Sequence, residues 1–219
     1  MYRSSVKKLY GMNSCCAERS ETPRPPLVQL IPAVSRPAPP WLAVAIIDLK
    51  MQELSLQDFA GKYLILLFYP CDFSFMCPTE LIQFSDRIAE FRALSSEVVA
   101  VSTDSKFSHF AWVTTPRKQG GLGEMKIPLL SDKSHQIARD YGVLDEKQGY
   151  AYRALFVIDR QQIIRHVTIN DQDLPRSVDE VLRVIKACCF VDKNGSLCPY
   201  GPVPTKNAFG EEPDYFSTT

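Results

Sequence analysis

The chain has 219 residues, and its 25 Lys and Arg side chains balance its 25 Asp and Glu side chains. A net charge of zero argues against a broad surface for nucleic acid or anionic membrane, because either surface needs an excess of basic residues. The longest apolar runs are as long as buried strands and fall short of the about 20 residues of a membrane span. An apolar share of 45% suffices for a sizeable core, so we expect one domain with extensions.

The cysteine pattern favours a few special thiols in a reducing compartment. An odd number of cysteines in a chain of this size argues against a secreted disulfide framework. The sequence has no Cys-x-x-Cys pair, and its three histidines lie far from any cysteine cluster, so a structural zinc site has little support. The seven cysteines are Cys15, Cys16, Cys71, Cys77, Cys188, Cys189 and Cys198.

Residues 1–33 are predicted to be a disordered, proline-rich extension. Seven prolines fall between Pro23 and Pro40, with no sustained apolar period. Residues 1–17 carry three basic side chains, several serines and no acid, a composition typical of an organelle transit peptide and equally of a disordered tail. Both interpretations stay open, and the expected location is cytoplasmic or mitochondrial.

From residue 41 onward, apolar runs alternate with helical patterns. The run at 63–69 predicts a buried strand, and apolar residues spaced three or four apart from Leu81 to Leu94 predict a helix with one apolar face. Ser177 and Glu180 have the spacing of a capping box at the start of the last helix. Further strands are expected at 97–102, 127–130, 152–158 and 163–169, and further helices at 107–113 and 134–141.

This order of elements predicts a mixed central sheet with helices on both faces, because strands and helices alternate before a final hairpin and helix. The hairpin joins the strands at 152–158 and 163–169 through a short polar segment. We expect the domain to span residues 34–190, followed by a C-terminal arm at 191–219.

Cys77 stands out because it follows a central strand and opens a helix. The carboxyl end of such a strand is where open α/β sheets bind ligands. Pro78, directly after it, is favoured in the first turn of a helix. A cysteine at a helix N-terminus lies near free N–H groups and the positive end of the helix dipole, which stabilise a thiolate.

A buried structural cysteine would explain the position of Cys77 about equally well. Two neighbours favour a reactive thiol. The hydroxyl of Ser74, three residues before the sulfur, can donate a hydrogen bond to a peroxide oxygen, and Pro70 can shield a pocket from water.

The motif Pro70-x-x-x-Ser74-x-x-Cys77 resembles the active-site motif Pro-x-x-x-Thr/Ser-x-x-Cys of the peroxiredoxins. Other segments resemble the typical two-cysteine subgroup, the alkyl hydroperoxide reductase C and thiol-specific antioxidant family, in the same order along the chain. The resemblance extends over residues 37–190 and more loosely to 216. The matching segments are 75–80, 104–105, 109–112, 115–117, 120–123, 127–132, 141–143, 152–156 and 176–180.

The resemblance implies a thioredoxin-like α/β fold and thiol-dependent reduction of hydrogen peroxide and organic hydroperoxides, with no metal or organic cofactor. Cys77 would be the peroxidatic cysteine that becomes a sulfenic acid. Ser74 would bind the peroxide, Arg153 would stabilise the thiolate and the transition state, and Pro70 would shield the site. The supporting pair would be Glu80 and Arg176, bracing the helix that carries the cysteine.

Cys198 resembles the resolving cysteine of the same subgroup. The resemblance implies that this thiol of one subunit attacks the sulfenic acid of the other, giving an intersubunit disulfide that a thioredoxin-like protein reduces. It also implies a homodimer, with a decameric ring as the larger assembly.

The segments around the arm depart from the family pattern. The family has a tryptophan three residues after the resolving cysteine, which the run 198–204 lacks, and Pro175 stands where glycine is usual. The alternative hypothesis is therefore a divergent relative that acts as a redox sensor or holdase chaperone with weak turnover. A thiol–disulfide oxidoreductase is disfavoured because the chain has no Cys-x-x-Cys.

Two further segments resemble paired motifs of peroxiredoxins that are easily over-oxidised. They are Gly120–Gly123 and the terminal Tyr215-Phe216. In such proteins both pack over the helix of the peroxidatic cysteine and slow its unwinding, so a second peroxide converts the sulfenic acid to sulfinic acid.

Overall fold

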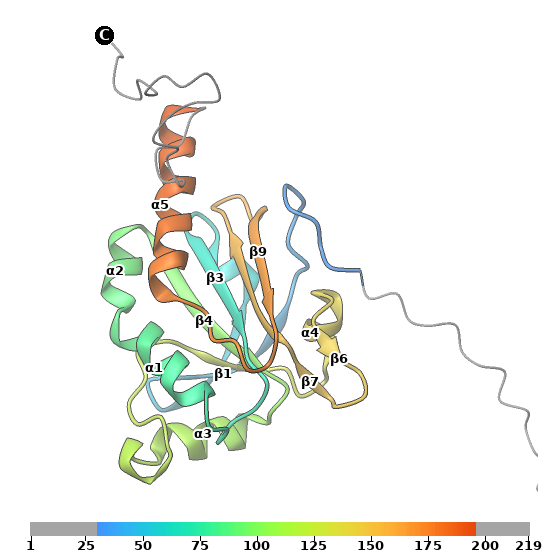
Figure 1. The fold of residues 1–219 in the computed structure, drawn as a ribbon, viewed down its shortest axis with the longest axis vertical. Coiled ribbons are helices and arrows are strands. Elements are labelled where there is room, and N and C mark those ends of the chain that lie inside the picture. Colours follow the sequence, from blue (N-terminus) through green and yellow to red (C-terminus); the bar gives the residue numbers. More distant parts are fainter. Residues whose placement is uncertain (1–29, 196–219) are drawn as a thin grey trace, which may run out of the picture.

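The computed structural model describes residues 30–195, in which a central sheet lies between helices (Figure 1). A seven-stranded sheet in this part of the chain has the order β2-β1-β5-β4-β3-β8-β9. Its strands are β1 (Leu42–Ile47), β2 (Lys50–Ser55), β3 (Tyr63–Phe68), β4 (Ser96–Ser102), β5 (Leu129–Ser131), β8 (Arg153–Ile158) and β9 (Ile164–Asn170). A small second sheet pairs β6 (Leu144–Asp145) with β7 (Tyr150–Ala151).

The helices cover both faces of the large sheet. The α-helices are α1 (Cys77–Asp86), α2 (Ile88–Ala93), α3 (Lys106–Thr114), α4 (Gln136–Asp140) and α5 (Val178–Asn194), and the 3-10 helices are η1 (Leu56–Phe59) and η2 (Arg117–Gln119). One hydrophobic core joins α1, α2, α3 and α5 to the sheet, and a second core joins α4 and η1 to its other face. Within residues 30–195, no helix combines the length and the apolar character that crossing a membrane requires.

β3 lies at the centre of both cores. All six of its side chains are buried, and they alternate between the two cores because successive side chains of a strand point to opposite faces. β3 pairs in parallel with β4 and antiparallel with β8. The mixed sheet with helices on both faces is confirmed, as is the antiparallel pair formed by β8 and β9.

The single helix expected up to Leu94 is wrong, because the chain breaks it at Arg87 into α1 and α2. Arg87 has φ −97° and ψ 12°, outside the helical range, and its side chain forms ion pairs with Glu90 and Asp179. Leu81 and Ile88 nevertheless pack in the same core. The apolar spacing continues across the break, so periodicity alone cannot locate it.

The hairpin of β1 and β2 was not anticipated from the sequence. Its turn is Asp48-Leu49, with φ values of +47° and +59°, a left-handed conformation that usually calls for Asn-Gly or Gly-Gly. The usual turn signal is therefore missing, although β1 supplies buried side chains at Ala45 and Ile46.

The last helix begins as expected, with the Ser177 hydroxyl accepting from the backbone N–H of Glu180. α5 continues to Asn194, past residue 191, where the arm was expected to start. The helix thus extends to within four residues of Cys198.

The segment 120–123 lies directly against the end of α3. The N–H groups of Gly121 and Gly123 donate to the carbonyls of Pro116 and Thr115. A Cβ at Gly121 would lie 1.9 Å from the Thr115 carbonyl oxygen, which explains why glycine is needed there.

We expect Gly121→Ala to lower the free energy of unfolding by about 3 kcal/mol, because the backbone must move to admit the new atom. Gly120→Ala is the matched control. Gly120 has φ +83°, and no atom lies within 4 Å of an added Cβ. Its replacement by alanine should therefore lower the free energy of unfolding by only about 1 kcal/mol, the cost of a left-handed backbone conformation for a residue with a Cβ. Urea denaturation of both variants measures the difference, and equal losses would contradict the close approach.

Candidate active site

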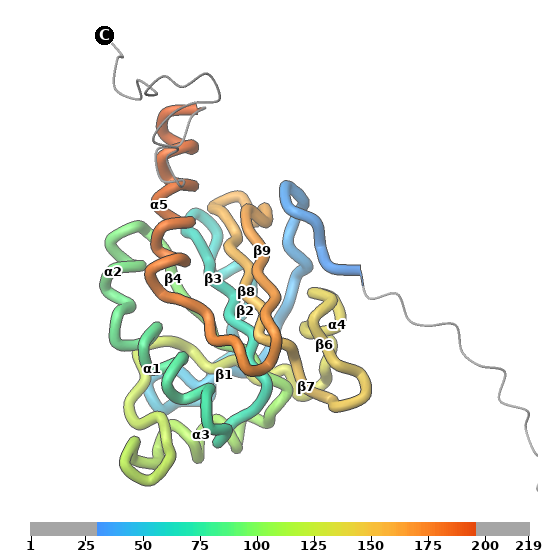
Figure 2. The backbone as a smooth tube through the Cα atoms, viewed as in Figure 1, coloured from blue at the N-terminus to red at the C-terminus, as the bar shows by residue number. Residues whose placement is uncertain are grey.

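Cys77 is the first residue of α1. The loop of residues 69–76 joins the end of β3 to the start of α1 (Figure 2). Its side chain is fully buried. Pro78 stands in the first turn of α1, where its missing N–H leaves no donor unpaired. The expected position of Cys77 at the N-terminus of a helix is confirmed.

Arg153 brings a positive charge to this sulfur from the first position of β8. Its Nη2 lies 3.4 Å from Cys77 Sγ, and its Nη1 lies 3.0 Å from Glu80 Oε2. Its Nε donates to the backbone carbonyl of Gln172 at 2.5 Å. Arg153 is 3% exposed, so its guanidinium is buried and does not reach solvent at the edge of the strand. The guanidinium is aimed at the sulfur by acceptors on two other segments.

Glu80 and Arg176 form the buried ion pair that supports this arrangement. Arg176 donates to Glu80 through its backbone N–H, its Nε and its Nη2, each at 2.7 Å. Its Nη1 donates to the carbonyls of Phe68 and Ala154, at 2.5 Å each. These two carbonyls belong to the neighbouring strands β3 and β8, so Arg176 fastens α1 to the centre of the sheet.

The charges around Glu80 decide its protonation. Burial by itself would raise the pKa of Glu80, but the hydrogen bonds and charge of Arg176, together with the charge of Arg153, outweigh burial and hold the pKa below its usual value of 4.5. Glu80 is therefore a carboxylate at neutral pH, shared between two guanidinium groups.

Pro70 and Ser74 lie in the loop between β3 and Cys77. Pro70 is buried. The Ser74 Oγ is also shielded from solvent, and it has no hydrogen-bond partner among residues 30–195. A buried hydroxyl without a partner costs free energy, and such a group in a native structure calls for an explanation. A substrate oxygen bound beside Cys77 would supply the missing partner.

The other described thiols differ from Cys77 in their surroundings. Cys71, Cys188 and Cys189 are partly exposed and unbridged. Burial raises the pKa of each of these three thiols, and nearby negative groups raise it further, against the opposing effect of an arginine. They are therefore held in the unreactive protonated form, because the thiolate is the nucleophile.

Two predicted elements lie outside the described residues. Cys198 and the pair Tyr215-Phe216 both follow residue 195. Among residues 30–195, no group of three or more His, Cys, Asp or Glu side chains is arranged to hold a metal ion.

The sequence did not identify a buried polar cluster beside the loop. Asp72, in the loop, contacts His109, on α3, and Tyr69, at the end of β3. Its signal in the sequence is His109 in the segment 109–112, but a single histidine in an apolar helix resembles an ordinary core residue.

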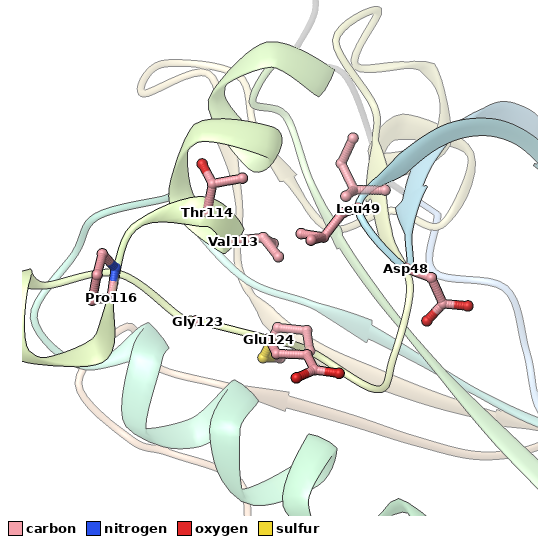
Figure 3. Close-up of a pocket in the computed structure, with 9 residues that line it drawn as sticks. Asp48, Leu49, Val113, Thr114, Pro116, Gly123 and Glu124 are labelled. Atoms are coloured by element: carbon pink, nitrogen blue, oxygen red, sulfur yellow. The ribbon is translucent and has the colours of Figure 1, made fainter.

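Two clefts lie near these elements. One, of about 510 Å³, separates the start of α1 from the segment before α5 and is lined by Met76, Glu80 and Arg176, among others. The other, of about 480 Å³, lies between the β1–β2 turn and Gly123, with Leu49 and Val113 facing it (Figure 3). The first touches the supporting pair, whereas the second is lined by none of the predicted catalytic side chains.

Comparison with known proteins matches residues 34–167 to the AhpC/TSA family. Peroxiredoxin prdx-2 of Caenorhabditis elegans is 52% identical over 187 residues, which cover 84% of this chain and 93% of that protein. Peroxiredoxin 2 of Drosophila melanogaster is 49% identical over 193 residues, which cover 86% of this chain and all of that protein. The crystal structure of reduced Plasmodium vivax 2-Cys peroxiredoxin is similar with a TM-score of 0.74 and 39% identity, over 77% of this chain and 88% of that one.

Glu80→Gln should lower the free energy of unfolding by about 3–5 kcal/mol at neutral pH, because it leaves two buried guanidinium groups without their shared anion. It should also weaken the loss of stability in acid. Because the pKa of Glu80 is depressed in the folded protein, its contribution is complete above the unfolded value of about 4.5 and is lost as the pH falls through the folded value.

Urea denaturation of wild type and Glu80→Gln between pH 3 and pH 7 measures both effects. Glu53→Gln, which neutralises an exposed carboxylate on β2, is the control and should change stability by less than about 0.5 kcal/mol. Equal acid sensitivity in Glu80→Gln and the wild type would contradict the assignment.

Proposed function

This chain belongs to the AhpC/TSA family and is a thiol-dependent peroxiredoxin peroxidase of the two-cysteine type, and on this premise we propose that Cys77 is the sulfur that reduces the hydroperoxide. The observation that carries the proposal is the contact between Arg153 Nη2 and Cys77 Sγ at the N-terminus of α1. A cation and a helix N-terminus both favour the thiolate, and no other described thiol has both.

In the first step the Cys77 thiolate attacks one oxygen of the hydroperoxide. An S–O bond forms and the O–O bond breaks, so the sulfur is oxidised to a sulfenic acid while the peroxide is reduced to water or an alcohol. The departing oxygen carries negative charge until it takes up a proton. Arg153 stabilises that charge, and the Ser74 hydroxyl donates to the peroxide and orients it for in-line attack. Pro70 keeps water from the sulfur.

Glu80 and Arg176 act through Arg153 and are positioning residues. Glu80 accepts from Arg153 Nη1, which leaves Nη2 directed at Cys77. Arg176 in turn holds Glu80 against two strand carbonyls. Because all three charges are buried, none can move without leaving another unpaired.

Resolution by Cys198 completes the proposed cycle. The Cys198 thiol of the partner subunit attacks the sulfenic acid, an S–S bond forms, and water leaves. A thioredoxin-like protein then reduces this disulfide by thiol exchange. The relatives' two-cysteine type supports this pathway, and it requires at least a homodimer, for which we propose a decameric ring as the larger assembly.

We propose that the chain is divided into a domain, an arm and an extension. Residues 34–190 form the peroxidase domain, residues 191–219 are the arm that carries Cys198, and residues 1–33 are an extension that either targets the protein to mitochondria or leaves it in the cytoplasm.

Cys77→Ser should abolish peroxide reduction, because a serine hydroxyl supplies almost no anion at neutral pH. Cys198→Ser should still consume one equivalent of peroxide per chain but lose steady-state turnover with a thioredoxin system. Mass spectrometry of peroxide-treated wild type should find a Cys77–Cys198 disulfide between chains. Activity of Cys77→Ser near that of wild type would sink the assignment, and single oxidation without turnover in the wild type would favour a redox sensor or holdase.

Arg153→Met should reduce the fraction of Cys77 present as thiolate at neutral pH and slow its oxidation about tenfold or more, because the cation that contacts the sulfur is removed. Thiolate absorbance and single-turnover oxidation measure the two effects. Arg165→Met is the matched control, since Arg165 lies on β9 and pairs with Asp159 and Asp192 instead. An unchanged thiolate fraction in Arg153→Met would refute the electrostatic role.

A further inference from the structure

The loop that carries Ser74 is held by one face of α3. His109 and Trp112 are three residues apart on this helix, so their side chains project from the same face. His109 contacts Asp72, and the Trp112 ring lies 5.8 Å from the ring of Phe73, centroid to centroid. The two loop residues directly before Ser74 are therefore both in contact with α3.

The contact between His109 and Asp72 is closed off from water. The His109 side chain is 0% exposed and that of Asp72 is 2% exposed. His109 Nδ1 lies 2.8 Å and 3.1 Å from the two oxygens of Asp72, while Nε2 lies 3.2 Å from the backbone carbonyl of Leu130 on β5. The ring thus connects the loop to the sheet.

Both ring nitrogens of His109 have oxygen atoms within hydrogen-bond distance. Nδ1 also lies 3.4 Å from the Tyr69 hydroxyl, so the imidazole joins a cluster with Asp72 and Tyr69. The ring therefore ties the loop to α3 and β5 by hydrogen bonds on both of its sides.

Further hydrogen bonds fix Asp72 from other directions. The Tyr69 hydroxyl donates to Asp72 Oδ1 at 2.8 Å, and the Asp72 backbone N–H donates to Asp104 Oδ2 at 2.8 Å. Burial, followed by the charge of Asp72, raises the pKa of Tyr69 well above its usual range, so Tyr69 remains a donor. Asp72 is thus hydrogen-bonded to the residue directly after β3, to α3 and to the segment after β4.

This anchoring fixes the approach to Ser74. Phe73, between Asp72 and Ser74, has φ +54°, a conformation that a non-glycine residue adopts only when its surroundings impose it. The contacts at Asp72 and Trp112 are those surroundings. Ser74 Oγ, the next side chain, is buried and has no partner in the described part of the chain. A strained loop anchored on both sides keeps this hydroxyl in place before substrate arrives.

We propose that His109 is a positioning residue of the peroxidase reaction, which holds the loop through Asp72 so that the Ser74 hydroxyl meets the peroxide beside Cys77. The inference rests on the proposed function, in which Ser74 donates to the peroxide. Loss of the anchor displaces the hydroxyl while leaving Arg153 in contact with the sulfur. Peroxide attack therefore slows although the thiolate is still present.

Two variants distinguish the loss of the hydrogen bonds between Asp72 and His109 from the effect of leaving a buried charge unpaired. In Asp72→Asn the amide can donate to His109 Nδ1 and accept from the Tyr69 hydroxyl, and the rate of Cys77 oxidation in this variant is the reference for the next one. Adding His109→Phe to Asp72→Asn removes the ring's hydrogen bonds without leaving a charge unpaired. The single-turnover rate with hydrogen peroxide should then fall about tenfold to a hundredfold, since a misplacement of 1 Å can cost about a hundredfold.

Two readouts distinguish positioning from general loss of stability. The thiolate absorbance of Cys77 at neutral pH should be the same in both proteins. In a Ser74→Ala background, the same addition of His109→Phe to Asp72→Asn should cause no further loss of rate, because the hydroxyl it positions is gone. His166→Phe, which alters a half-buried histidine on β9, is the control and should keep the wild-type rate.

Three results would overturn the proposal: a rate within threefold of Asp72→Asn after His109→Phe is added, an equal further loss in the Ser74→Ala background, or a reduced thiolate fraction. Labelling of the Cys77 sulfenic acid in wild type keeps the proposed function separate. If the label appears but adding His109→Phe to Asp72→Asn does not change the rate of Cys77 oxidation, the positioning role fails and the peroxidase assignment stands. If no label appears on Cys77, the assignment of the nucleophile itself fails.

Discussion

Glu80 is a buried carboxylate that accepts hydrogen bonds from two buried guanidinium groups, and the site is built around it. One of these groups contacts Cys77, and the other holds the carbonyls of β3 and β8. Taking three charges out of water is expensive, and a buried pair is weak evidence of net stabilisation. Removing one member is much worse than keeping all three, because the remaining charges lose their partners. The network therefore fixes where α1 begins relative to the sheet.

The loop before Cys77 is organised by a second buried network, centred on Asp72. In the proposed reaction, Glu80 orients the cation at the sulfur, and Asp72 holds the loop that carries the Ser74 hydroxyl. Cys77 belongs to neither set of paired charges. Its sulfur contacts Arg153, and its side chain packs in the hydrophobic core of the α1 face. The N-cap residue of α1, Met76, offers no side-chain hydrogen bond to the first turn, and the neighbouring Phe75 is 97% exposed. The start of α1 thus lacks a side-chain cap, whereas Glu80, three residues after Cys77, is held by Arg153 and Arg176.

The described thiols differ in their surroundings, and this difference bears on which of them is oxidised. Cys71 is only six residues from Cys77, yet burial raises its pKa, and the opposing charge of Arg153 does not offset that rise. Cys188 and Cys189 lie on α5 with the same dominant effect of burial. A protein with several cysteines can therefore direct oxidation to one of them, because position at a helix N-terminus beside a guanidinium differs from position on a helix flank.

The sequence by itself determined the central strand, the start of α1 at Cys77, the mixed sheet and the residue types of the site, because these follow from local patterns: an apolar run, a proline in a first turn, and a motif with fixed spacing. It could not locate the break at Arg87, since apolar spacing continues through it, or the β1–β2 hairpin, whose left-handed turn is Asp48-Leu49. Local patterns do not say which groups meet: the pair of Glu80 and Arg176 was expected only from the family resemblance, and the contact of Asp72 with His109 was not expected. Glu80 and Arg153 are 73 residues apart, and Asp72 and His109 are 37 apart. Such pairs form because β3 and β8 are neighbours and α3 packs beside the loop, and long-range packing of this kind leaves no periodic signal in the chain.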